Sequence, residues 1–211
     1  MSSARPTTLK VVQPDPTPAR TKGELTRHAI LESAIARFAR DGYRKTSVAD
    51  VARHAGVGGT VTYAYFPNKE ALFLAAVDED AAGLFREALT AAFEQPTDEN
   101  WRRTVFFTLL RTLDHHPLAR RLFAGLEPEF TARVLDMPAL AEIRKLHAEQ
   151  MRTEQIAGVL RHDIDPDRMA NGFLIMQLSF LMSVVQVGME VAVAYADDVT
   201  AVFEAALRSP S

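Results

Sequence analysis

The side chains best suited to bind another molecule gather in one short stretch, residues 58–65, which reads GGTVTYAY. The phenol groups of Tyr63 and Tyr65 can donate hydrogen bonds to phosphate oxygens. Thr60 and Thr62 offer hydroxyl groups, and each also carries a methyl group that can touch thymine. This combination indicates contact with the backbone and the base edges of duplex DNA.

Two short helices hinged at a glycine would position these groups. Ser47 and Asp50, three residues apart, form a capping-box pattern that starts the first helix. Apolar residues then recur along one helical face, at Val48, Val51, Ala52 and Ala55. Gly56 follows, where a helix can end in the left-handed conformation that glycine adopts at low cost, and the second helix covers about residues 58–65. Such a pair is a helix-turn-helix, whose second helix can enter the major groove.

Helical patterns surround this pair. Before it, apolar residues at helical spacing predict a supporting helix over about residues 24–40, which Gly42 ends. After it, Pro67 and Asn68 open a helix that is expected to reach about Phe93 and to bridge two domains. Further helices are predicted over about residues 98–113, 117–126, 138–160, 173–189 and 197–208. No segment alternates with period two, so the predicted fold is all-α.

Charge divides the chain into a basic head and an acidic body. Residues 20–70 carry nine Lys and Arg against five Asp and Glu, whereas residues 71–211 carry 13 against 21. A protein with this distribution can present one end to phosphates and keep the other away from them. The 211-residue chain is 47% hydrophobic and contains no cysteine, which excludes disulfides and thiolate metal sites and fits a reducing cytoplasm.

The first 22 residues are expected to form a disordered arm. They contain four prolines among small and polar residues, and no apolar run that would indicate a signal peptide. The basic residues Arg5, Lys10 and Arg20 suggest an arm that reaches into the minor groove, and an inert tail is the alternative.

Several other local patterns point to weaker interpretations. Residues 56–60, GVGGT, resemble a phosphate-binding loop but follow a helix and lack its Lys-Ser/Thr pair. Asp114, His115 and His116 could be metal ligands, but adjacent histidines on a helix point about 100 degrees apart, so a solvated helix end is expected. Polar residues interrupt the apolar run 173–189, which favours a buried helix over a membrane span. No catalytic or cofactor motif is present, and an enzyme is not expected.

Taken in order, these residues resemble the DNA-binding domain of the TetR/AcrR family of bacterial one-component transcriptional regulators. Seven short matches span about 45 residues: Ile30-Leu31, Gly42-Tyr43, Thr46-Ser47-Val48, Val51-Ala52, Ala55-Gly56-Val57, Tyr63-Ala64-Tyr65-Phe66 and Lys69-Glu70-Ala71-Leu72. The chain departs from the family where Ser-Lys/Arg-Gly-Thr-Leu/Val is usual. Residues 58–62 read Gly-Gly-Thr-Val-Thr instead, without the long basic side chain.

The resemblance implies a three-helix helix-turn-helix domain over residues 23–70 and a C-terminal ligand-binding and dimerisation domain over residues 71–211. It implies a cytoplasmic homodimer, paired through its last two helices, that binds a pseudo-palindromic operator in double-stranded DNA as a ligand-responsive repressor. The expected DNA-contacting residues are Thr46, Ser47, Gly58, Gly59, Thr60, Thr62, Tyr63, Tyr65 and Lys69.

The resemblance also implies a small-molecule pocket among the middle helices. The expected pocket residues are Trp101, Phe106, Phe123, Met151, Phe173, Met176, Gln177 and Phe180. Their aromatic and methionine content suggests a hydrophobic or aromatic ligand, and the amide of Gln177 in an apolar run needs a partner. No cofactor, metal or membrane is expected. The alternative is an all-helical small-molecule-binding dimer whose altered recognition helix binds DNA weakly or without specificity.

Overall fold

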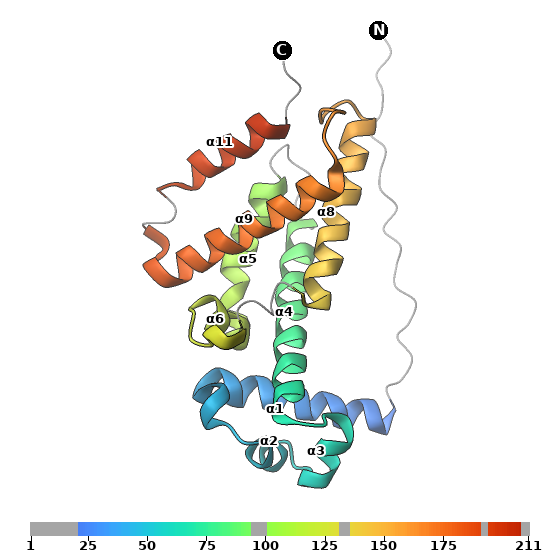
Figure 1. The fold of residues 1–211 in the computed structure, drawn as a ribbon, viewed down its shortest axis with the longest axis vertical. Helices are drawn as coiled ribbons and strands as arrows, with labels where there is room; N and C mark the ends of the chain where they lie inside the picture. Colours follow the sequence, from blue (N-terminus) through green and yellow to red (C-terminus); the bar gives the residue numbers. More distant parts are fainter. Residues whose placement is uncertain (1–20, 94–100, 131–135, 191–193, 208–211) are drawn as a thin grey trace.

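The computed structural model describes residues 21–93, 101–130, 136–190 and 194–207, without the side chains at 91–93, 101–103, 196–197, 200 and 203–204. Every regular element in these ranges is helical, which confirms the predicted all-α fold (Figure 1). The elements are α1 (Lys22–Lys45), α2 (Val48–His54), α3 (Gly59–Tyr65), α4 (Lys69–Phe93), α5 (Trp101–Thr112), η1 (Leu113–His115), α6 (Pro117–Phe123), η2 (Pro128–Phe130), α8 (Pro138–Ile156), α9 (Pro166–Val187) and α11 (Ala196–Leu207).

Helices α1 to α3 form the head, at the opposite end of the molecule from α11 (Figure 1). A capping box starts α1, in which the Thr21 hydroxyl and the Glu24 carboxylate each accept the other residue's backbone N–H. Buried apolar residues on α1 include Ile30, Leu31 and Phe38. They form the surface onto which α2, α3 and the start of α4 pack.

The predicted glycine turn joins α2 to α3. The Ser47 hydroxyl accepts the Asp50 backbone N–H at 3.1 Å and so caps α2. Gly56 has a φ of 69°, and the N–H groups of Gly56 and Val57 donate to the carbonyls of Arg53 and Ala52. This double hydrogen bond is a Schellman motif, and it confirms the left-handed glycine at the hinge.

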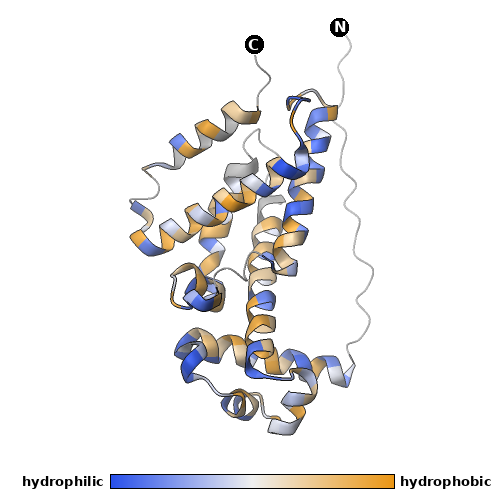
Figure 2. Cartoon of the chain, in the orientation of Figure 1, coloured by the Kyte–Doolittle hydropathy of each residue, from blue (hydrophilic) through white to orange (hydrophobic). Residues whose placement is uncertain are grey.

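Helix α4 belongs to the head and to the rest of the molecule. Apolar residues run along it (Figure 2), and Leu72, Phe73 and Val77 are buried in one cluster with Phe38 of α1. That cluster also includes Leu118 and Leu122 of α6, with Phe130 and Met137, so it crosses the boundary expected between residues 70 and 71. We call α5 to α11 the body and treat α4 as common to both parts.

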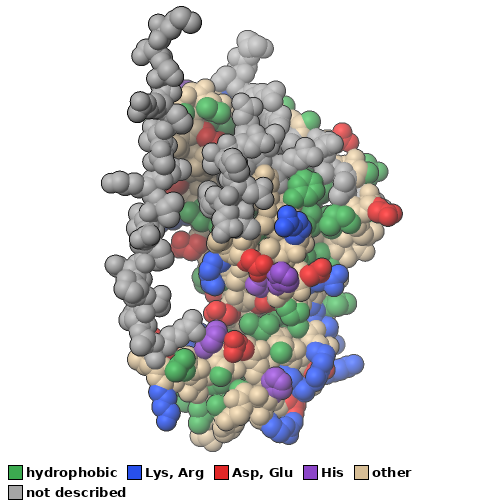
Figure 3. Space-filling view, turned by 180° about the vertical axis from the view of Figure 1, so that it is seen from behind, with side chains coloured by type: hydrophobic (Ala, Val, Ile, Leu, Met, Phe, Trp, Pro, Cys, Tyr) green, Lys and Arg blue, Asp and Glu red, His purple; other side chains and the backbone are tan. Residues whose placement is uncertain are grey.

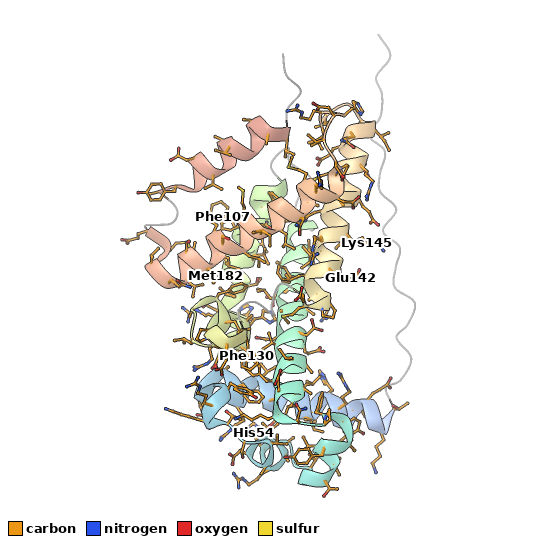
Figure 4. All side chains as sticks on the ribbon, in the orientation of Figure 1. His54, Phe107, Phe130, Glu142, Lys145 and Met182 are labelled. Carbon is orange, nitrogen blue, oxygen red and sulfur yellow. The ribbon has the colours of Figure 1, made fainter. Side chains whose placement is uncertain are left out.

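A buried carboxylate joins the head to the body. Glu127, which is 4% exposed, accepts hydrogen bonds from the Arg121 Nε at 2.7 Å and from the Tyr43 backbone N–H at 3.0 Å. Beside it, the Phe130 ring lies 4.7 Å from the Tyr43 ring and 4.5 Å from the Phe73 ring (Figure 4). The end of α1 is therefore held against α6 and η2 by the hydrogen bond from Tyr43 to Glu127 and by aromatic packing.

A second polar contact ties α4 to the start of α6. The Asp80 carboxylate accepts the backbone N–H groups of Leu118 and Ala119 at 2.9 and 2.8 Å and lies 3.1 Å from His116 Nδ1. Glu87, two turns further along the same face of α4, contacts His115 Nδ1 at 2.8 Å and His116 Nε2 at 3.2 Å. The expectation of a solvated helix end is confirmed for His115, whose side chain is 68% exposed, and is wrong for His116, which is 13% exposed between the Asp80 and Glu87 carboxylates.

Replacing Gly42 by alanine is expected to lower the free energy of unfolding by more than about 2 kcal/mol. Gly42 has a φ of 82° and a ψ of 167°, and an added Cβ would lie 2.5 Å from Arg121 Nη2 and 2.9 Å from Glu127 Oε1. Gly56→Ala is the matched control, because Gly56 has positive φ but open space around it, and about 1 to 2 kcal/mol is expected there. Urea unfolding measures both variants. Equal losses of unfolding free energy would show that the close contacts of Gly42 with Arg121 and Glu127 do not matter.

The Glu87 contacts are expected to stabilise the fold fully above about pH 4.5 and progressively less in more acidic buffer. Hydrogen bonds from His115 and then from His116 lower the pKa of Glu87 from its ordinary value of 4.5. Because the folded-state pKa is the lower one, the contribution is present above the unfolded-state pKa and is lost as pH falls through the folded-state pKa. The melting temperature of Glu87→Gln should therefore lie below that of the unmodified protein at pH 6, and the difference should close in more acidic buffer. Glu142→Gln, at an exposed carboxylate on α8, is the control, and a pH-independent difference for Glu87→Gln would argue against the assignment.

Candidate nucleic-acid interface and apolar cavity

One face of α3, with the N-cap before it, points away from the molecule and carries four of the nine predicted contact residues. Thr60 is exposed, Tyr63 is 54% exposed, and both glycines before them, Gly58 and Gly59, are exposed. Gly58 is the N-cap of α3, and it makes no side-chain capping hydrogen bond because it has no side chain. The start of α3 therefore exposes main-chain atoms without side chains at Gly58 and Gly59.

The opposite face of α3 is buried, and this changes two of the predicted contacts. Thr62 is 0% exposed and Thr46 is 1% exposed, so neither side chain can reach DNA. The Thr46 hydroxyl donates to the Gly42 carbonyl at 2.9 Å, and Thr62 lies one turn before the buried Phe66, on the side that packs against α1 and α2. The predictions for Thr46 and Thr62 are therefore wrong, since both residues serve the packing of the head.

Val61 takes the outward place that was expected for Thr62. It is 41% exposed and belongs to the same outward surface as Thr60 and Tyr63. The sequence held a signal for this, because Phe66 was expected to pack inward and Thr62 lies four residues before it. Val61 is one position away and so turns about 100 degrees from that buried side.

Two predicted contacts at the edge of α3 are already engaged within the head. The exposed Ser47 caps α2 and also donates to the Asp50 carboxylate at 2.6 Å, which lowers the pKa of Asp50. Tyr65 is half-buried. The contacts of both residues with DNA stay predictions.

Lys and Arg side chains lie on both sides of the head (Figure 3), and several are held by intramolecular contacts. The Lys69 ammonium lies 4.4 Å from the Tyr43 ring centre and donates to the Arg44 carbonyl at 3.3 Å. Arg53 pairs with Asp50, and the Arg27 guanidinium lies over the Phe66 ring. These contacts fix the cations in place. Since an ammonium group has three donors, Lys69 retains donor capacity for a phosphate.

Helix α2 is fastened to α1 beneath this surface. The Ser33 hydroxyl donates to the Val51 carbonyl at 2.8 Å and lies 3.1 Å from His54 Nδ1 (Figure 4). Ser33 is buried, so the bond is shielded from water. The first helix of the motif, α2, is thereby held at a fixed position on the supporting helix α1.

An apolar cavity of about 180 Å³ lies in the body, between α4, α6 and α9. All of its lining residues but Ser179 are apolar. They are Val77, Ala81, Ala119, Leu122, Phe123, Met137, Ile175, Leu178, Ser179 and Met182. An uncharged apolar group matches this lining, because a buried charge would have no partner there.

The structure does not bring the predicted pocket residues together. Only Phe123 lines the cavity, while Phe106 and Phe180 pack on one another at 5.0 Å in the core of the body. Met151 and Phe173 belong to a separate buried cluster, and Met176 is 37% exposed. These five residues therefore do not border this cavity, and their assignment to a ligand pocket stays a prediction. Composition does not distinguish a helix face that packs from one that borders a cavity.

Two predicted pocket residues have other outcomes. The Gln177 side chain is 9% exposed, and its Nε2 has no hydrogen-bond partner among the described residues, but it does not line the cavity. The side chain of Trp101 lies outside the described residues, as do all residues of the expected arm before Thr21.

Comparison with known proteins identifies the head. Residues 30–76 match the family described as "Bacterial regulatory proteins, tetR family". The "Uncharacterized HTH-type transcriptional regulator YuxN" of Bacillus subtilis (strain 168) is 41% identical over 98 residues, which cover 46% of this chain and 32% of that protein. The "Probable acrEF/envCD operon repressor" of Escherichia coli (strain K12) is 35% identical over 94 residues, 43% of each chain. The chain thus spans less than half of the length of either relative.

The fold as a whole matches solved structures more completely. FadR of Thermus thermophilus, a TetR family transcriptional repressor in complex with lauroyl-CoA, superposes with a TM-score of 0.62. The superposition covers 88% of this chain and 97% of that chain at 23% sequence identity. At this level of sequence identity the comparison shows a common fold and does not show that the two proteins bind the same ligand. The family match over the head, the regulator relatives and the common fold together show that the chain belongs to the TetR/AcrR family of bacterial transcriptional regulators.

Proposed function

We propose that the protein is a cytoplasmic, ligand-responsive transcriptional repressor that binds a pseudo-palindromic DNA operator as a homodimer. The observation that carries this proposal is the outward face of α3, which the buried Thr62 and Phe66 fix from below and which belongs to a segment, residues 20–70, with nine Lys and Arg against five Asp and Glu. Two such heads in one dimer would lie in successive major grooves, roughly 34 to 36 Å apart.

Exposed apolar surface on α9 and α11 supports pairing through these helices. Val187 and Met189 are exposed at the end of α9, and Val202 on α11 is 64% exposed. Helix α9 is long and apolar enough to cross a membrane by length and composition, yet only 33% of its most apolar window is buried within the chain. A second copy of the chain would cover this surface, as in a four-helix interface.

The cavity supports a small apolar ligand. Its volume of about 180 Å³ is of the order of the ~150 Å³ apolar cavity that accepts benzene. The ligand would therefore insert an uncharged group about as large as a benzene ring or a short alkyl chain. The lauroyl-CoA bound by the Thermus thermophilus protein also has an apolar chain, which supports the same general class of ligand.

The cavity and the head are linked through α6. Ala119, Leu122 and Phe123 line the cavity, while Arg121, on the same helix, holds Glu127 against the Tyr43 backbone. A ligand that displaces α6 would therefore move the head and change the spacing of the two heads in a dimer. Since the coupling is reciprocal, bound DNA would weaken ligand binding by the same factor.

A second candidate function is an all-helical ligand-binding dimer that binds DNA without specificity. It is favoured by the start of α3, where the N-cap Gly58 offers no capping side chain and Gly59 costs up to about 1 kcal/mol relative to alanine within a helix. The two functions differ in whether one duplex is preferred over others.

Selection of bound duplexes from random DNA tests the proposal. A palindromic winner should be bound on the order of a thousandfold more tightly than scrambled DNA at physiological salt. Equal and steeply salt-dependent binding to both duplexes would instead support the second candidate.

Tyr63→Phe should weaken binding to the selected duplex roughly fivefold, because it removes one hydrogen bond from the phenol to a phosphate. Tyr195→Phe removes the same hydroxyl from an exposed tyrosine next to α11, far from the head, and should leave the affinity unchanged. Fluorescence anisotropy with labelled duplex measures both variants. An unchanged affinity for Tyr63→Phe would remove Tyr63 from the interface.

Filling the cavity should abolish ligand binding. The Ala119→Leu variant places three further carbon atoms among the lining residues, so benzene or hexanol should raise the melting temperature of the unmodified protein but not of this variant. Ala141→Leu, at an exposed position on α8, makes the same change outside the cavity and should retain the response. A response that persists in Ala119→Leu would place the ligand elsewhere.

A further inference from the structure

The outward face of α3 lacks the side chains that usually read guanine and adenine. Its exposed residues are Gly59, Thr60, Val61, Tyr63 and Ala64. Guanine is read mainly by arginine or lysine and adenine by asparagine or glutamine, through paired hydrogen bonds in the major groove. None of these four residue types occurs in α3. Direct reading of bases by this helix must therefore use hydroxyl groups or apolar contact.

Apolar contact has only one strong partner among the bases. The C5-methyl group of thymine is the apolar feature of the major-groove edge, whereas the other bases present hydrogen-bonding groups there. An apolar side chain aimed at the groove gains by burying that methyl group, and it leaves a donor or acceptor unsatisfied when it meets another base. A valine on this face is therefore a selective group.

We propose that Val61 selects thymine in each operator half-site by packing against its C5-methyl group. The inference rests on the proposed DNA-binding function and adds the chemical feature of the operator that is read. Thr60, the neighbouring outward residue, adds a second methyl group beside Val61, and Tyr63 supplies a phosphate contact that sets the register.

The backbone around Val61 suits such a short side chain. Valine reaches only a short distance from its helix, so the helix axis must come close to the base edges. Gly58 and Gly59 have no side chains to hold the helix off, and a Cβ at Gly59 would meet nothing within 4 Å in the free protein. Close approach of backbone to a ligand is a common reason for glycine.

The side chain is also well defined before DNA binds. The buried Thr62 and Phe66 fix the rotation of α3 on the head, so the side that carries Val61 has a set direction. Valine is β-branched and has one strongly preferred rotamer in a helix, so little side-chain entropy is lost when it contacts a methyl group. A flexible side chain at this position would discriminate less well.

Replacement of thymine by deoxyuridine tests the inference, because it removes the C5-methyl group and preserves base pairing. The duplex is the winner of selection from random DNA, and each thymine of a half-site is replaced in turn in both half-sites. At one thymine position the Kd of the unmodified protein should rise about fourfold for each methyl group lost, and so about 15-fold for the symmetric pair.

The same duplexes are then measured with Val61→Ala. This variant should bind the thymine duplex more weakly and should no longer distinguish thymine from deoxyuridine at that position. Val159→Ala is the matched control, because Val159 is an exposed valine in the turn after α8, at the other end of the molecule, and it should retain the full ratio. Circular dichroism melting confirms that each variant is folded.

The outcomes separate the inference from the function on which it rests. A selected palindrome whose affinity is insensitive to deoxyuridine at every position would overturn the inference and leave the repressor proposal intact. Retention of the deoxyuridine effect in Val61→Ala would also overturn it, since the methyl group would then act through another side chain or through DNA shape. Failure to select any duplex would overturn both proposals.

Discussion

The buried carboxylate of Glu127 is the contact on which the arrangement of head and body depends. A carboxylate this deep in the protein is stable only when it is neutralised, and Arg121 and the Tyr43 backbone N–H satisfy it together. One donor comes from the body and the other from the head, so the position of the charge fixes both parts. Gly42 makes this possible, because its positive φ and missing side chain leave room for the two charged groups.

The same few contacts connect the two ends of the molecule. Asp80 caps the first turn of α6 from α4, and His116 packs over Gly83, where a Cβ would lie 2.7 Å from the imidazole ring. Asp80 and Gly83 of α4 thus hold the start of α6 close to α4, next to the cavity. Polar contacts fix these helices at defined points, whereas the cavity wall between them is apolar and can be filled without breaking a hydrogen bond. This combination suits a protein in which a small apolar molecule shifts one helix against another.

Helix α3 contains no arginine or lysine, so its proposed recognition of DNA depends on short neutral side chains and not on charged ones. In the proposed complex, charged side chains outside α3 would attract the phosphates, and Arg27, Arg53 and Lys69 are already held by a neighbouring acid or aromatic ring. The helix itself contributes short, neutral groups whose value depends on close contact. Gly59, which permits this contact, also weakens the first turn of α3, so affinity and helix stability oppose one another at residue 59.

The sequence by itself determined what short-range interactions control. Ser47 and Gly56 fix the start and the end of α2 through contacts within a few residues, so the helix-turn-helix was predictable, as were the helical breaks near Pro117 and Pro138. Tertiary structure alone decided which faces are buried. Packing of α3 on the head turned Thr62 inward and Val61 outward, and α4 brought carboxylates to His115 and His116. The cavity formed where α4, α6 and α9 leave space between them, and only Phe123 of the predicted residues borders it, because packing of distant segments is not encoded in composition or periodicity.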